Sequence, residues 1–325
     1  MLMNLTLAIC IYNASRYIEE TLQSVLAQQM QEFYLLLIDD CSTDDSIKRI
    51  EQFFLDHPRQ HELVCFEENR GLAFGRYYAE HNVHTEYLMF LDADDVLYPR
   101  AIATLYNKIV SDVDLIGVGC YLEYIDENSQ RIGGGIFLGE TSKDSFYRKA
   151  RLNKLIFMQS TAIYRRETAL SIGGHAINGF PSGKPRFQDY CEDLDFWTRM
   201  SDLYTEGKAI VVVPEVLCRY RKSSGLSSNA FYMMVKMRYV KTNLLRRRSG
   251  KTELTFIEFY NSLSDTEVTQ LKHDAIAADC LRNGVLLLRQ FRVLSGIWLI
   301  LESIYYCPDY WIDKLKHNTR IFRRE

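Results

Sequence analysis

The sequence predicts an α/β fold in which helices flank a mostly parallel sheet, with a helical extension at the C-terminal end. Two observations favour this fold class. Short apolar, β-rich runs alternate with helical patterns through the first half of the chain, and from Phe231 onward the pattern is helical. The 325 residues are 47% hydrophobic and 25% charged, a globular balance in a chain long enough to bury a large core.

The first half reads as strands that alternate with helices. Four strands are predicted, at Leu5–Ile11, Tyr34–Ile38, Leu63–Phe66 and Tyr87–Leu91. A predicted helix follows each of the first three strands. The first buries Ile18, Leu22 and Val25, and the second starts in the capping run Ser42-Thr43-Asp44-Asp45. The third spans Gly71–His81. A sheet built in this order is covered on both faces, and ligands of such sheets bind outside the carboxyl ends of the strands.

The later part of the chain gives fewer signals. A helix beyond Pro99 leads to a strand at Leu115–Tyr121, and Ala209–Val213 is a further strand. Gly133-Gly134-Gly135 predicts a hairpin turn, and the glycines and prolines of residues 139–190 predict a long irregular segment. Apolar residues at helical spacing predict one continuous stripe near the end, formed by Leu281, Val285, Leu288, Phe291, Leu294, Trp298, Leu301 and Tyr305.

Charge and cysteine usage exclude several classes of protein. The formal net charge is −3, so no overall basic field indicates a nucleic-acid partner. The eight cysteines form no C-x-x-C or Cys/His cluster, which favours a reducing, cytoplasmic setting. The start MLMNLTLAICIYN lacks the features of a signal peptide, and Arg289, Arg292 and Glu302 interrupt the apolar run Val285–Tyr306, so we expect no transmembrane helix.

Basic side chains concentrate near the C-terminal end. Lys and Arg outnumber Asp and Glu from Tyr232 onward, and the reverse holds before it. The run Arg246-Arg247-Arg248 is combined with aromatic residues, as in helices that lie on a membrane surface: Trp298, Tyr305, Tyr306, Tyr310 and Trp311. A solvated helix face, packing on the preceding domain and contact with a second copy in a homo-oligomer are the alternatives, and the sequence leaves them open.

Three acidic clusters stand where predicted strands should end: Asp39-Asp40, Asp92-Ala93-Asp94-Asp95 and Glu192-Asp193. Any one of them could simply cap the next helix. Gathered at one sheet edge, they would repel each other unless a cation or a hydrogen-bonding ligand offsets the charge. The D-x-D spacing of Asp92 and Asp94 suits a hard divalent ion, so Mn²⁺ or Mg²⁺ held together with substrate phosphates is the expected cofactor.

Six motifs in order resemble the family 2 glycosyltransferases, whose GT-A fold has a Rossmann-like sheet: LTLAICIYN, LLLIDDCSTDDS, ENRGLAFGRYY, FLDADDVLYP, CEDLDFWTRM and RYRKSSGLSS. The resemblance spans about residues 5–228. It implies a catalytic domain at 1–228, with a nucleotide-binding half at about 1–110 and an acceptor-binding half at about 111–228. Residues 229–325 would form the C-terminal helical extension.

The resemblance also implies roles for individual residues. Tyr12 matches the aromatic residue that packs on the base, Asp40 matches the carboxylate that hydrogen-bonds the base edge, and Asn13 completes this end of the nucleotide-sugar site. The loop and helix that close over the nucleotide are represented by Asn69, Gly71 and Arg76.

The reacting end of the site is implied in the same way. Asp92 and Asp94 match the D-x-D motif, with Asp94 the more direct metal ligand and Asp92 shared between metal and nucleotide-sugar. Asp193 matches the catalytic base, and Arg221 a late motif near the diphosphate. The sequence departs from the family at Cys10, Cys41, Tyr77 and Ser223, which leaves the nucleotide preference and the role of the late loop open.

These residues imply an inverting glycosyltransferase of hexosyl or N-acetylhexosaminyl type. A UDP-sugar is the expected donor, and a saccharide or lipid-linked saccharide in surface polysaccharide, lipopolysaccharide or glycan assembly is the expected acceptor. The protein would be cytoplasmic, with contact to the inner face of the membrane through the C-terminal helices as one alternative. A carboxylate base is needed because the attacking hydroxyl is a weak nucleophile.

Three other functions stay as alternatives. A metal-dependent phosphohydrolase would carry D-x-D on its first strand, and a nucleotidyltransferase would carry a glycine-rich basic loop there, whereas this first strand ends in Tyr12-Asn13. An inactive module that binds sugar nucleotides would not need Asp193. The absence of G-x-G-x-x-G after the first strand excludes a dinucleotide oxidoreductase.

Overall fold

The computed structural model describes residues 4–136, 139–159, 161–222, 229–289 and 292–308. Ser223, Phe291, Tyr310 and Trp311 lie outside these ranges. The chain divides into two compact units. The first unit comprises residues 1–223 and 240–253, and the second comprises residues 224–239 and 254–325.

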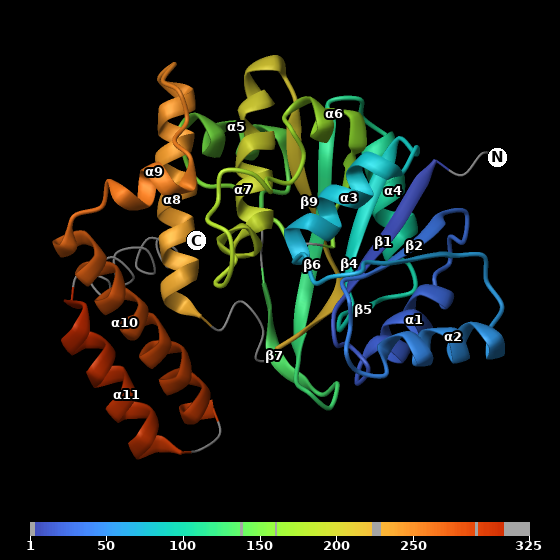
Figure 1. Ribbon diagram of the computed structural model, residues 1–325, viewed down its shortest axis with the longest axis horizontal. Helices are drawn as coiled ribbons and strands as arrows, with labels where there is room; N and C mark the ends of the chain where they lie inside the picture. The colour runs from blue at the N-terminus through green and yellow to red at the C-terminus, as the bar shows by residue number, and fades with distance from the viewer. Residues whose placement is uncertain (1–3, 137–138, 160, 223–228, 290–291, 309–325) are drawn as a thin grey trace. The chain divides into compact units, whose positions relative to one another are not determined.

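The first unit is built on one sheet whose strands have the order β3-β2-β1-β4-β8-β6-β9-β5, with β7 paired to β6 (Figure 1). The strands are β1 (Leu5–Ile11), β2 (Tyr34–Asp39), β3 (Glu62–Cys65), β4 (Tyr87–Asp92), β5 (Val96–Leu97), β6 (Leu115–Ile125), β7 (Arg131–Ile136), β8 (Ile163–Arg165) and β9 (Ala209–Arg221). β1 pairs in parallel with β2 and β4, β2 with β3, and β6 with β9. The expected α/β fold with a mostly parallel sheet is therefore confirmed.

Helices cover this sheet because the central strands are apolar on both faces, with Leu7, Ile9, Leu37 and Leu88 all buried. The helices of the first unit are α1 (Ile18–Leu26), α2 (Ser46–Asp56), α3 (Leu72–Asn82), α4 (Ala101–Val110), α5 (Lys143–Arg151), α6 (Arg166–Ser171) and α7 (Glu192–Met200), with short 3₁₀ turns η1 (Phe187–Asp189) and η2 (Ser201–Glu206). Phe196 and Trp197 of α7 are core residues.

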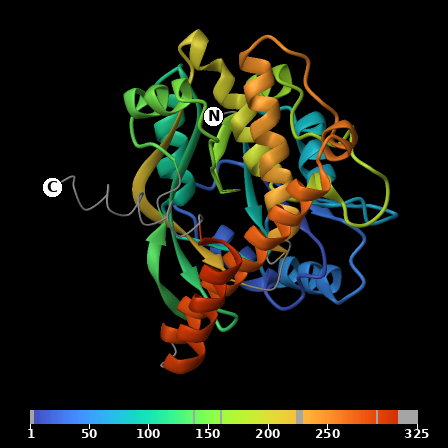
Figure 2. The same cartoon turned by 90° about the vertical axis from the view of Figure 1, so that its left-hand side faces the viewer.

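Two predictions about the middle of the chain are wrong. The glycine run 133–135 lies within β7, and the hairpin turn stands earlier, where Asp126 N–H donates to the Gln130 carbonyl and Ser129 adopts a positive φ of 61°. Residues 139–190 contain α5, β8, α6 and η1 rather than one irregular segment. β8 has only three residues, too few for a periodic signal, yet it joins β4 to β6. Figures 1 and 2 show the β6–β7 hairpin as neighbouring green strands.

Two arginines of the basic run Arg246-Arg247-Arg248 form ion pairs within the first unit. α8 (Ala230–Arg248) passes from the second unit into the first at residue 240. Asp202 accepts ion pairs from Arg247 at 2.6 Å and from Arg248 at 2.8 Å, and both arginine side chains are largely buried. These two arginines therefore form neither a solvated helix face nor a surface that can meet lipid.

The second unit is helical, with α9 (Phe256–Asn261), α10 (Asp265–Arg289) and α11 (Val293–Tyr306). α10 and α11 lie side by side as a hairpin (Figures 1 and 2). The single stripe expected from Leu281 to Tyr305 is wrong, because α10 ends at Arg289 and α11 begins at Val293. No helix of the described residues is long and apolar enough to cross a membrane.

Buried hydrogen bonds join α3 to β8 and to the segment that follows it. Glu80 is fully buried, and its carboxylate accepts hydrogen bonds from the His175 backbone N–H at 2.7 Å and from the Tyr164 hydroxyl at 2.9 Å. His175 Nδ1 lies 2.8 Å from the same carboxylate, so this histidine is a buried structural residue and not a surface residue of a loop. Burial alone would raise the pKa of Glu80, but the charge and hydrogen bonds of His175 outweigh it and hold that pKa below its ordinary value.

Glu80→Gln should lower the free energy of unfolding by about 1–3 kcal/mol, because the buried hydrogen bonds lose their charged acceptor. Since the folded-state pKa of Glu80 is lowered, its stabilisation is complete above its ordinary pKa of about 4.3 and is lost as the pH falls through the folded-state pKa. Chemical denaturation near pH 7 and near pH 3 should therefore give a larger difference at the higher pH.

Glu19→Gln is the control, because Glu19 and its partner Arg49 form an ion pair at 2.7 Å whose side chains are both about half exposed. This variant should change the unfolding free energy by less than about 1 kcal/mol. Equal effects of the two substitutions would contradict the role given to Glu80.

Candidate active site at the carboxyl edge of the sheet

The predicted site residues lie where the parallel strands end. Asp39, the last residue of β2, is in register with Ile11 of β1 and Cys65 of β3, and Asp92, the last residue of β4, is in register with Cys10. The carboxyl ends of neighbouring parallel strands thus bring two of the three acidic clusters to one edge, where ligands of such sheets bind.

Asp40 organises the loop before α3. Its carboxylate accepts hydrogen bonds from Asn69 Nδ2 at 2.8 Å, Arg70 N–H at 2.6 Å and Gly71 N–H at 2.8 Å. Gly71 has a positive φ of 95°, which favours glycine at this turn. The structure therefore brings Asp40, Asn69 and Gly71 together, but both carboxylate oxygens of Asp40 already accept hydrogen bonds from protein groups.

The neighbouring Asp39 has a different environment. It is buried, its Oδ2 accepts the Ser42 N–H at 3.0 Å, and its Oδ1 has no hydrogen-bond partner within the described part of the chain. A buried acceptor without a donor is costly, which makes this oxygen a candidate for a ligand N–H. The sequence does not single out Asp39, because the family resemblance assigns the base contact to Asp40, the second residue of the pair.

Tyr12 and Asn13 follow β1 at the same edge. The side chain of Tyr12 is 49% exposed, so its ring surface is accessible to a ligand. Asn13 has a positive φ of 52°, and its Oδ1 accepts the Thr43 N–H at 2.8 Å. Its N–H donates to Ser42 Oγ at 2.9 Å, so Asn13 ties the loop after β1 to the loop after β2.

The first turn of α3 is covered by residues from the segment before α7. Asp189 Oδ1 accepts the Ala73 N–H at 3.0 Å, and Arg186 donates to the side chain and the carbonyl oxygen of Asn69. Burial raises the pKa of Asp189 to about 6. The sequence gives no local signal for these long-range partners, which connect the nucleotide-loop candidate Asn69 to the second half of the unit.

Arg76 bridges two acidic clusters. Its side chain is 3% exposed, with Nη1 2.8 Å from Glu192 Oε1 and Nη2 3.1 Å from Asp92 Oδ1. Arg76 was expected to contact the nucleotide, but both terminal nitrogens bind protein carboxylates. The third acidic cluster is thereby joined to the D-x-D motif through a buried cation.

Asp193 differs from its neighbour Glu192. Glu192 is buried against Arg76, whereas the side chain of Asp193 is half-buried, and its Oδ1 accepts the Leu194 N–H at 2.7 Å. Burial and the charge of Glu192 raise the pKa of Asp193 above its ordinary value, and the charge of Arg76 opposes this rise. A carboxylate of raised pKa is a stronger proton acceptor than an ordinary aspartate.

Of the D-x-D residues, Asp92 ends β4 and Asp94 lies in the turn between β4 and β5. No group of three or more His, Cys, Asp or Glu side chains that could hold a metal ion occurs among the described residues. Mg²⁺ is commonly held by one or two carboxylates together with substrate phosphates, so two aspartates fit an ion whose remaining ligands come from a diphosphate and water.

Arg221, the last residue of β9, lies behind this turn. Its side chain is fully buried, and Nη2 is 2.6 Å from Glu20 Oε2 of α1 while Nε donates to the Asp94 carbonyl at 2.8 Å. Arg221 was expected near the diphosphate. Its guanidinium contacts support the backbone of the turn instead.

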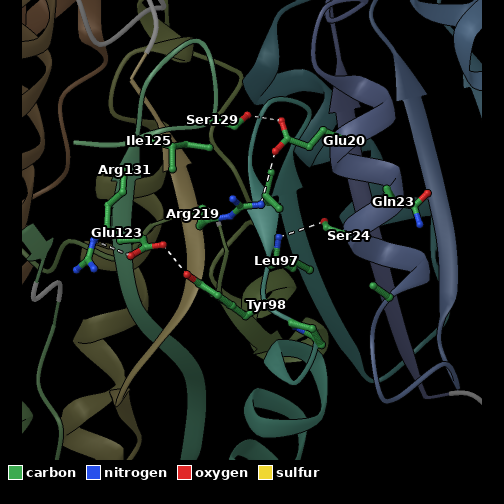
Figure 3. Close-up of a pocket in the computed structure, with 13 residues that line it drawn as sticks. Glu20, Gln23, Ser24, Leu97, Tyr98, Glu123, Ile125, Ser129, Arg131 and Arg219 are labelled. Atoms are coloured by element: carbon green, nitrogen blue, oxygen red, sulfur yellow. Dashed lines mark hydrogen bonds and ion pairs between the residues drawn. The ribbon is translucent and has the colours of Figure 1, made fainter. Parts of the chain in front are cut away.

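A cavity of about 420 Å³ lies beside α1, β5 and the ends of β6 and β9 (Figure 3). Its lining includes Glu20, Ser24, Tyr98 and Arg219, and it contains none of the predicted donor-site or catalytic residues. Arg219 and Glu20 approach within 3.6 Å at its wall. The cavity is therefore separate from the cluster of carboxylates at the sheet edge.

Comparison with known proteins finds relatives whose sequences match part of this chain. A teichoic acid poly(glycerol phosphate) polymerase of Staphylococcus epidermidis is 33% identical over 166 residues, which are 50% of this chain and 22% of that protein. This chain thus spans about a fifth of that relative's length.

Two solved structures share the fold, each covering 93% of this chain. S. aureus TarS 1-349 in complex with UDP-GlcNAc has a TM-score of 0.56 at 19% identity, with 91% of that chain covered. The mannosyltransferase PcManGT from Pyrobaculum calidifontis, in complex with GDP-Man and Mn²⁺, has a TM-score of 0.52 at 17% identity, with 86% covered. The family model for glycosyl transferase family 2 matches residues 6–172, and the chain belongs to this family.

Proposed function

We propose that this chain transfers a sugar from a UDP-sugar to an acceptor hydroxyl with inversion at the anomeric carbon. The observation that carries the proposal is that the neighbours Glu192 and Asp193 have different environments. Arg76 binds Glu192 and Asp92, while the adjacent Asp193 is half-buried and has a raised pKa. One proton acceptor beside a D-x-D turn is the arrangement that a single displacement needs.

The donor site would lie between the ends of β1, β2 and α3. Tyr12 offers an exposed ring for the base, and Asp39 Oδ1 offers a buried acceptor for a base N–H. In this proposal Asp40 and Asn69 shape the loop, and Asp39 replaces Asp40 as the residue that reads the base. The UDP-GlcNAc complex of the structurally similar TarS supports a uridine nucleotide.

The acceptor would be a hydroxyl group of a cell-surface polymer or its lipid-linked precursor. The relative named for teichoic acid polymerisation supports this class of acceptor. Asp193 would take the hydroxyl proton as the new glycosidic bond forms, and the nucleoside diphosphate would leave on the opposite face. A divalent ion bound by Asp92 and Asp94 would supply positive charge for the departing diphosphate.

Asp193→Asn should lower the transfer rate by about 10²–10⁴-fold, because the amide keeps the shape of the side chain but cannot accept the proton. Affinity for UDP, measured by calorimetry, should stay within about twofold because the base does not hold the nucleotide. Single-turnover assays with a UDP-sugar, together with the anomeric configuration of the product by NMR, check the assignment.

Glu192→Gln is the matched control. It should lose about 1–3 kcal/mol of stability, because it weakens the bond to buried Arg76, but it should keep most of the transfer rate at saturating substrate. If Glu192→Gln is inactive and Asp193→Asn is active, the base is misassigned by one residue. A product of retained configuration would overturn the single-base mechanism.

Asp94→Asn should abolish Mn²⁺-dependent enhancement of UDP binding and most of the turnover, because one of two carboxylate ligands is lost. A chelator should have the same effect on the unchanged protein. Asp45→Asn, at an exposed carboxylate in the loop after β2, should behave like the unchanged protein. Full transfer in excess chelator would contradict metal dependence. Calorimetry with and without Mn²⁺ reports the binding effect apart from turnover.

We further propose that α11 contacts an anionic membrane surface. Its buried residues are the small Gly296 and Ser303, and the Ser303 hydroxyl donates to the Ala277 carbonyl of α10 at 2.6 Å. A surface helix usually turns its large apolar side chains toward the protein core. The large side chains are exposed instead: Leu294 86%, Tyr305 82%, Trp298 69%, Leu301 56% and Ile297 45%.

The chemistry of these exposed α11 side chains favours a membrane as the partner. Aliphatic residues combined with tryptophan and tyrosine are typical of interfacial helices. The sequence that follows α11 carries more Lys and Arg than Asp and Glu, which favours anionic lipid. A lipid-linked acceptor would be presented at such a surface.

Trp298→Glu should reduce co-sedimentation with phosphatidylglycerol vesicles by about tenfold or more, since burying one large apolar side chain contributes about 1.5–3 kcal/mol. Tyr34→Glu, at an exposed tyrosine of β2, should leave vesicle binding unchanged. Light scattering tests the alternatives. A loss of oligomers in Trp298→Glu with unchanged vesicle binding would assign the face to a second copy.

A further inference from the structure

The backbone of the D-x-D turn is fixed by residues behind it. Arg221 N–H donates to Asp95 Oδ1 at 2.9 Å, and Arg221 Nε donates to the Asp94 carbonyl at 2.8 Å. Thr21 Oγ1 of α1 donates to the carbonyls of Ala93 at 3.0 Å and Asp95 at 2.9 Å. Three consecutive carbonyl groups of the turn thus accept side-chain hydrogen bonds.

The other end of Arg221 is anchored in two separate elements. Nη2 lies 2.6 Å from Glu20 Oε2 on α1, and Nη1 donates to the Asp126 carbonyl at 2.8 Å and to Ser129 Oγ at 3.0 Å in the β6–β7 turn. The Ser129 hydroxyl also donates to Glu20 at 2.6 Å, as Figure 3 shows. Arg221 therefore connects the turn to both α1 and the hairpin.

This anchoring matters because the turn carries adjacent carboxylates. Asp92, Asp94 and Asp95 place three carboxyl groups within four consecutive residues, and like charges so close together repel each other unless a cation or hydrogen-bond donors offset them. A backbone held at successive carbonyls keeps the ligand side chains in place before an ion arrives. Residues that orient metal ligands in this way typically affect metal affinity by about 10–100-fold.

We propose that Arg221, neutralised by Glu20, is a positioning residue that sets the geometry of the Asp92–Asp94 turn for the divalent ion. Arg221 does not contact the diphosphate in this arrangement. The inference rests on the proposed metal-dependent function and assigns Glu20 and Thr21, which no sequence motif singled out, to the support of the same site.

Arg221→Lys tests the proposal, because lysine keeps the charge but cannot bind Asp94, Glu20 and Ser129 together. The Mn²⁺ concentration that gives half-maximal enhancement of UDP binding should rise by about 10–100-fold. Free Mn²⁺ measured by electron paramagnetic resonance should rise in parallel. UDP affinity without metal should stay within about twofold, and excess Mn²⁺ should restore most of the transfer rate.

Two further variants separate positioning from folding. Thr21→Val removes the hydroxyl donor to the turn and should also weaken Mn²⁺ binding, whereas Thr21→Ser should restore it. Arg219→Lys is the matched control, because Arg219 lies two residues earlier on β9, reaches only 3.6 Å from Glu20 and is in register with Val96 beyond the turn. It should leave Mn²⁺ binding unchanged.

Each contrary outcome overturns a different statement. Unchanged Mn²⁺ affinity in folded Arg221→Lys and Thr21→Val overturns the positioning role alone. A loss of metal-free UDP affinity in Arg221→Lys, equal to the loss with metal, makes Arg221 a nucleotide ligand and overturns the proposal. If the UDP affinity of the unchanged protein does not depend on Mn²⁺, the metal assignment and the positioning role are both overturned.

Discussion

The buried guanidinium of Arg76 is the interaction on which the arrangement of carboxylates at the sheet edge depends. Its terminal nitrogens bind Glu192 at 2.8 Å and Asp92 at 3.1 Å, and the Arg76 side chain is only 3% exposed. Two acidic clusters from distant parts of the sequence can approach only because this cation offsets their repulsion. Removing it would leave two carboxylates close together without compensation.

Arg221 is a second buried cation beside the same turn, and it forms an ion pair with Glu20 and donates a hydrogen bond to the Asp94 carbonyl. The family resemblance assigns both arginines to the donor, since each stands in a motif that lines the nucleotide-sugar site. Their contacts instead place the positive charges inside the protein. The carboxylate edge is therefore balanced in part by protein cations, so a bound divalent ion need not carry the whole compensation that the sequence suggested.

The sequence was sufficient for features that depend on local pattern. The strands that become β1, β2 and β4 and the D-x-D turn were predicted because apolar runs followed by acidic residues are local signals. The short strand β8 and the partners of Asp40 were not predictable in this way. β8 is held in the sheet by its neighbours, and the choice between Asp39 and Asp40 depends on where Arg70 and Gly71 direct their N–H groups.

The contacts of α3 show how the two halves of the first unit are connected at the site. Asp189 binds the first turn of α3, Arg76 of the same helix binds Glu192, and only three residues separate Asp189 from Asp193. The segment that carries Asp189, Glu192 and Asp193 is therefore attached to α3, the helix that follows the loop of residues 69–71. Both ends of this connection rest on contacts between segments far apart in the sequence, so the local sequence does not reveal that the loop before α3 and the segment of Asp193 share one helix.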